Sequence, residues 1–209
     1  MRIFSSFLVA LSLLLVSLSS YAEDSQDLLQ VLNPIHSLRA DFNQSLLDGQ
    51  GKALQKSSGK LVLQRPGQFR WDVRHPVPQL IIANSTRLWI YDPDLEQVVV
   101  RRVAKDLGKT PAFLLSNVST AINNDFVVKH MQSLQDWQWY SLTPKGKDGM
   151  FRVIQLGFLN NQIKEMRMQD NLGHSTVIKF SNVEQNGDVA PSLFKFRVPA
   201  NVDVIDETH

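Results

Sequence analysis

The chain has 209 residues, of which 43% are hydrophobic and 20% charged, a formal net charge of +2 and no cysteine. Such a composition is typical of a globular domain with a packed core and excludes an intrinsically disordered chain, because disordered chains are poor in hydrophobic residues. The small net charge argues against a nucleic-acid platform, and the lack of cysteine excludes disulfides, thiolate catalysis and cysteine-ligated metals.

Residues 1–22 have the pattern of a cleaved export signal. Arg2 supplies a positive charge, residues 7–18 form an apolar run, and small residues precede a cleavage point after Ala22. The run contains serines and is shorter than the stretch of about 18 apolar residues that a retained membrane anchor needs. We therefore expect the signal to be removed, leaving residues 23–209 as one domain in a periplasm.

The exported part begins with a predicted helix over residues 25–32. Ser25 suits an N-cap, apolar residues recur every three or four positions, and Pro34 disfavours a continued helix. The same spacing resumes through Leu38 and Phe42, which predicts a second short helical turn.

From residue 59 the hydrophobic period changes to two, which is typical of β-strands. The polar residues 47–58 before it suit a hairpin connection, and in residues 69–74 apolar and charged side chains alternate strictly. Ten strands are predicted from such patterns, at residues 59–64, 69–74, 79–83, 87–91, 95–102, 137–142, 150–158, 162–169, 174–183 and 194–198.

Short helices are predicted between the two groups of strands. Thr110 and Pro111 favour a helix start that leads into residues 112–115, and a second helical segment is predicted up to Ser133. The chain is therefore expected to be α+β, with helices covering the apolar face of a large antiparallel sheet that curls.

No catalytic or cofactor motif is present, so neither an enzyme nor a cofactor is expected. Residues 108–110 end like a phosphate-binding loop, but Val103 stands where the leading glycine should be. Asp92, Asp94 and Glu96 lack the glycine and the distal glutamate of a calcium loop. The five histidines show no pair at ligand spacing, which argues against a zinc site.

The apolar sheet face has two interpretations, an ordinary core or a cavity for a hydrophobic ligand under a helical lid. Arg65 distinguishes between them. It has the same parity as Leu61 and Leu63, so a regular strand would aim its guanidinium at the apolar side, where it needs acceptors such as helix-end carbonyls. A turn at Pro66 would instead rotate it into solvent.

At these residues the chain resembles the outer-membrane lipoprotein carrier protein family of Gram-negative periplasms, LolA. No matching stretch covers residues 116–136. The stretches that carry the resemblance are LVLQRPGQFRWDV (61–73), LWIYDP with the following LEQ (88–97), GKTPAFLL (108–115), VEQNG (183–187) and FKFRVP (194–199).

The resemblance implies an incomplete, half-open antiparallel β-barrel with a short-helix lid, whose hydrophobic cavity takes the acyl chains of a lipoprotein. It implies a monomeric chaperone that receives cargo from an inner-membrane ABC exporter and delivers it to an outer-membrane receptor. The family's lid-latch arginine falls on Arg65, and its cavity aromatics fall on Phe69 and Trp71. The full set of expected ligand-binding residues is Leu61, Leu63, Phe69, Trp71, Leu80, Ile82, Leu88, Ile90, Phe113 and Leu114.

Two alternatives remain at this point. The first is a periplasmic lipid or lipoprotein sensor with the same half-barrel, and the second is a small secreted hydrolase, for which no acid and base pair is marked. The receptor relative of the carrier has a lipid-modified N-terminal cysteine, so the lack of cysteine favours the carrier over the receptor.

Overall fold

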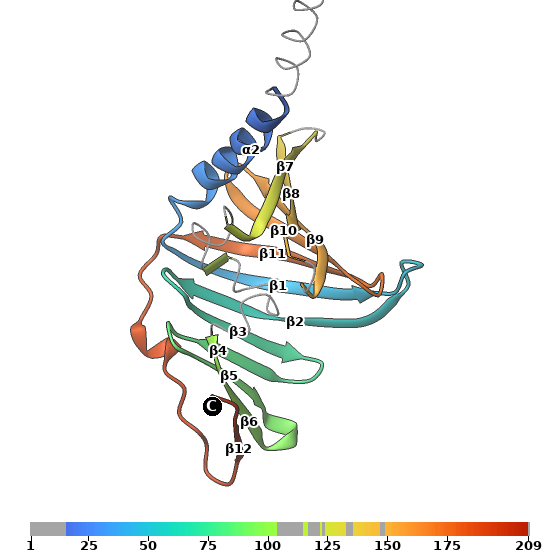
Figure 1. Cartoon of the computed structure of the whole chain (residues 1–209). Coiled ribbons are helices and arrows are strands. Elements are labelled where there is room, and N and C mark those ends of the chain that lie inside the picture. The colour runs from blue at the N-terminus through green and yellow to red at the C-terminus, as the bar shows by residue number, and fades with distance from the viewer. Residues whose placement is uncertain are drawn as a thin grey trace, which may run out of the picture.

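The computed structural model describes residues 16–103, 115–116, 122, 124–132, 136–146 and 149–208. These residues form helix α2 (Val16–Leu32), two short 3₁₀ helices, η1 (Pro93–Leu95) and η2 (Pro191–Phe194), and one twelve-stranded sheet (Figure 1). The strands are β1 (Ser37–Leu47), β2 (Ala53–Gln64), β3 (Gln68–His75), β4 (Gln79–Ala83), β5 (Arg87–Asp92), β6 (Gln97–Arg102), β7 (Phe126–Met131), β8 (Trp137–Pro144), β9 (Phe151–Leu159), β10 (Gln162–Asp170), β11 (Ser175–Gln185) and β12 (Asp203–Asp206).

The sheet is open, with the strand order β12-β6-β5-β4-β3-β2-β1-β11-β10-β9-β8-β7. Neighbouring strands pair antiparallel, except that β12 runs parallel to β6. The sheet curves, and α2 lies against the end formed by β7 and β8 (Figure 1). This arrangement confirms the predicted α+β fold, an incomplete antiparallel barrel with a helix over one side.

Helix α2 ends at Leu32, as Pro34 predicts, and its buried leucines join the main core. The helical turn predicted through Leu38 and Phe42 is wrong, because both residues lie in β1. Their spacing of four fits a period of two as well as a helix, and pairing with β2 and β11 selects the strand. The hairpin connection predicted over residues 47–58 is shorter in the structure, because β2 already begins at Ala53.

Two further differences concern the second half of the chain. The helical segment predicted up to Ser133 is wrong over Phe126–Met131, which forms the edge strand β7 and is rich in β-branched residues. The strand predicted at residues 194–198 is replaced by η2 and by an extended segment, and the last strand is Asp203–Asp206. Of the helix predicted from Thr110, the structure describes only its end, where Leu115 is helical.

The segment after β11 crosses the side of the sheet that faces away from α2, which we call the outer face. Phe194 is 2% exposed, and the Phe196 ring lies 6.4 Å from Trp89 and 5.8 Å from Tyr91, measured between ring centroids. Ile82 is buried nearby on the same face. The C-terminal segment therefore covers a small second apolar cluster that is separate from the main core.

We expect Phe194→Ala to lower the free energy of unfolding by about 3–5 kcal/mol, because it empties the buried anchor of this segment. Urea denaturation followed by tryptophan fluorescence measures the change. The matched control is Val198→Ala, since Val198 is 47% exposed and should be replaceable without loss. Equal unfolding midpoints for the two variants would contradict an anchoring role for Phe194.

Candidate functional site

The site is built on the inner face of the sheet, the side that packs against α2. Leu61 of β2 lies opposite Trp71 of β3, and Leu63 lies opposite Phe69, so these four side chains share one face. Phe42 of β1 stacks on Trp71 with ring centroids 3.8 Å apart. All five are buried, at 0–7% exposure. The strict alternation of β3 thus produces a continuous apolar surface, which is closed in this structure.

Arg65 extends this inner face just beyond the end of β2. Its Nε and Nη2 atoms donate to the backbone oxygen of Leu115 at 3.1 and 3.0 Å, and Nη1 donates to the backbone oxygen of Leu32. The guanidinium therefore joins the C-terminal end of α2 to the segment around Leu115. It points to the apolar side rather than into solvent, as its parity with Leu61 and Leu63 suggested.

The electrostatics of Arg65 follow from its position. Burial lowers the pKa of Arg65 to about 10, which leaves the side chain cationic at neutral pH. A buried charge of this kind requires hydrogen bonds, and the planar guanidinium can reach two carbonyls at once. Two neighbouring backbone bonds support the arrangement, because Gly67 N donates to Ser116 O at 3.1 Å and Arg65 N donates to His36 O at 2.9 Å.

Asn186, which the sequence pattern did not identify as a site residue, holds the junction between α2 and β1. Its Oδ1 accepts a hydrogen bond from His36 N at 2.7 Å, and its Nδ2 donates to Pro34 O at 2.9 Å. Ser37 Oγ donates to Gly187 O at 2.7 Å beside it. The only signal for this role is the asparagine-glycine pair in VEQNG, which reads as an ordinary turn until the fold is known.

The structure does not bring all expected ligand-binding residues together. Leu88 and Ile90 lie opposite Ala83 and Ile81 and share the inner face with Trp71. The prediction that Leu80 and Ile82 share this face is wrong, because they lie opposite Asp72 and Arg70 on the outer face. Strand β4 is apolar on both sides, so its parity could not be read from the sequence. Phe113 and Leu114 lie outside the described residues.

Within the described part of the chain, no helix combines the length and the apolarity that crossing a membrane requires.

The resemblances to known proteins are extensive. Residues 33–197 match the family model described as outer membrane lipoprotein carrier protein LolA. The chain is 37% identical over 209 residues to the outer-membrane lipoprotein carrier protein of Chromohalobacter salexigens, with 99% of each chain covered. It is 39% identical over 212 residues to the protein of that name from Pseudomonas aeruginosa, covering 99% of this chain and 100% of the relative.

Solved structures agree on the fold. An uncharacterized conserved protein from Thermus thermophilus superposes with a TM-score of 0.54 at 12% identity, covering 87% of this chain and 98% of that one. A DUF1329 family protein from Desulfovibrio piger gives 0.53 at 14% identity, covering 85% and 96%. Because the family model spans most of the chain and full-length relatives share more than a third of its residues, this protein belongs to the outer membrane lipoprotein carrier protein LolA family.

Proposed function

We propose that this protein binds the acyl chains of lipoproteins released from the inner membrane and carries them through the periplasm to an outer-membrane receptor. The proposal is supported above all by the Arg65 hydrogen bonds, which close helical segments over an apolar sheet face. An ordinary core needs no cationic latch in such a place. Family membership and the carrier names of the full-length relatives support the same role.

The energetics of acyl chains explain why a carrier of this kind needs a donor. Each buried methylene is worth about 0.8 kcal/mol, so one acyl chain of about 15 carbons represents about 12 kcal/mol. Extraction from a membrane is therefore not spontaneous, and an energised inner-membrane ABC exporter would supply the work. The carrier itself needs no nucleotide, and it acts as a monomeric chaperone without catalysis.

The closed inner face explains how release is possible. Leu61, Phe69 and Trp71 are buried by the chain's own residues, so loading must break the Arg65 bonds and separate helix from sheet. The free energy lost with these protein contacts offsets part of the free energy gained by burying the acyl chain. The net affinity for cargo therefore stays moderate. A receptor that binds the acyl chains more tightly then takes the cargo without further energy.

Native mass spectrometry of the exported protein, purified from its own envelope, tests the function. We expect a triacylated polypeptide to co-purify, and we expect Ile90→Gln to reduce the bound amount several-fold, because Ile90 faces the inner side of the sheet. Leu95→Gln is the control, since Leu95 is 72% exposed in η1. Free lipid without a polypeptide would favour the sensor, and absence of any bound lipid would contradict carriage.

A further inference from the structure

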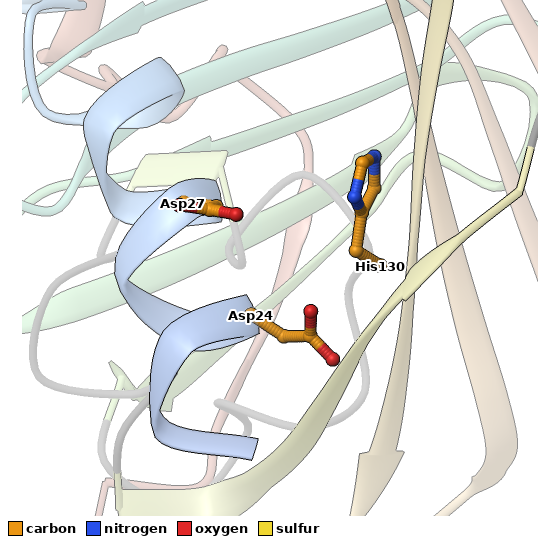
Figure 2. A group of neighbouring side chains, drawn as sticks. All are labelled: Asp24, Asp27 and His130. Atoms are coloured by element: carbon orange, nitrogen blue, oxygen red, sulfur yellow. The ribbon is translucent and has the colours of Figure 1, made fainter. Parts of the chain in front are cut away.

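A second cluster of polar side chains lies between α2 and β7, away from Arg65. Asp24 and Asp27 project from one side of α2 towards the imidazole of His130 on β7 (Figure 2). One ligand atom from each of the three residues lies within 4.8 Å of the other two. Neither carboxylate has a hydrogen bond or ion pair with the described residues, and both negative charges lie near the imidazole.

Asp27 and His130 also line a cleft of about 460 Å³ between the end of α2 and strands β7 and β8. The side chain of Tyr140, which is 2% exposed, points into this cleft, and its ring stacks on His130 with centroids 4.9 Å apart. No residue described by the structure makes a hydrogen bond to the Tyr140 hydroxyl. The ring is buried, but the hydroxyl is open to the cleft, so a polar group from outside the chain can reach it there.

The charge around Tyr140 agrees with this view. Burial raises the pKa of Tyr140, and the negative charges of Asp27 and Asp24 raise it further. The hydroxyl therefore keeps its proton and acts as a donor beside the two carboxylates. A cation between the aspartates would neutralise the excess negative charge, and the tyrosine hydroxyl could donate a hydrogen bond to an aspartate oxygen or to free water in the cleft.

We propose that Asp24, Asp27 and His130 bind one divalent transition-metal ion of the zinc type, with water completing its coordination. The donor set of two carboxylate oxygens and one imidazole nitrogen suits zinc, whereas calcium and magnesium prefer oxygen ligands throughout. Ligand atoms around tetrahedral zinc lie about 3.4 Å apart, so the side chains need to close inwards by no more than about 1.4 Å. The cleft leaves room for this movement and for the water.

The expected effect of the ion is to tie α2 to the edge of the sheet. His130 lies on the edge strand β7, and α2 also carries Leu32, whose carbonyl accepts a bond from Arg65. The metal would thus hold the same helix in its closed position at a second point. Metal binding stabilises the folded state in proportion to the logarithm of the metal concentration over its dissociation constant.

Zinc titration of the exported chain, purified without an affinity tag, tests the proposal in the absence of cargo. Calorimetry should detect one zinc ion per chain, and zinc should raise the thermal unfolding midpoint in a way that a chelator reverses. We expect Asp27→Asn and His130→Phe each to weaken zinc binding by at least about tenfold and to abolish the rise in the midpoint. His130→Phe keeps a ring to stack on Tyr140, so its fold should persist.

The matched control is His75→Phe, which removes an exposed histidine at the end of β3 and should leave zinc binding unchanged. Unfolding midpoints in the presence of chelator establish that each variant is folded. The proposal is overturned if the wild-type chain binds no zinc, if His130→Phe and Asp27→Asn bind it as tightly as the wild type, or if His75→Phe loses as much. Since no lipoprotein is involved, failure of the zinc site leaves the carrier function untouched.

Discussion

Arg65→Leu is expected to leave the protein loaded with cargo and unable to deliver it. The substitution deprives the carbonyls of Leu32 and Leu115 of their donor in the closed state, while in the open state water replaces it. Hydrogen bonds from a charged donor contribute about 1.5–3 kcal/mol each. Under the proposed function, a latch worth about 3 kcal/mol would lower the affinity for cargo about a hundredfold, and the variant would lose this restraint.

A purified delivery assay measures the fraction of lipoprotein that passes from the loaded carrier to its receptor. Hydrogen exchange of the α2 amides, measured on empty protein, should rise in the variant because the helix is no longer held. Arg70→Leu is the matched control, since Arg70 lies on the same hairpin but faces outwards beside Asp72. Wild-type delivery together with unchanged exchange in α2 would rule out the latch.

Gly59→Ala should destabilise the fold strongly, although it adds only one methyl group. A Cβ atom at Gly59 would lie 1.9 Å from the backbone oxygen of Asp72 and 2.9 Å from the Phe42 ring. Backbone cannot move aside as a flexible side chain can, so β2 and β3 would have to separate at their shared irregularity. Phe42 stacks on Trp71, and the strain therefore reaches the inner face. We expect a cost of about 3 kcal/mol or more.

Urea denaturation with tryptophan fluorescence provides the measurement for this variant. Gly146→Ala serves as the control, because a Cβ built at Gly146 meets no atom within 4 Å beyond its own chain neighbours and its backbone is not left-handed. That control should unfold at the wild-type midpoint, while Gly59→Ala should unfold at a clearly lower urea concentration. Equal midpoints would mean that the strands separate at little cost.

Much of the sheet was predictable because its pattern is local. Alternation in residues 69–74 predicted both the strand and its inner face. For the Arg65 guanidinium the sequence left two orientations open, and the parity with Leu61 gave the one towards the apolar side. The structure selects between them through contacts with Leu32 and Leu115, which lie 33 and 50 positions away in the chain. Local periodicity carries no information about partners so distant in the sequence.

The predictions that were wrong or missing have the same physical origin, since each depended on contacts distant in the sequence. Strand β4 is apolar on both faces, so only the covering by the C-terminal segment reveals that Ile82 lies outside the main core. The spacing of Leu38 and Phe42 fits helix and strand alike, and the neighbouring strands decide. The Asp27 and His130 side chains lie close together although about a hundred residues separate them in the sequence. No motif has a fixed spacing of that length.

The Arg65 guanidinium bonds to main-chain oxygens alone, since both of its acceptors are backbone carbonyls. Every residue type offers the same carbonyl, so the bonds themselves do not depend on which side chains stand at positions 32 and 115. The side chains of Leu32 and Leu115 are constrained instead by the core, where they are 1% and 3% exposed. Covariation between Arg65 and these two positions should accordingly be absent from an alignment of the family.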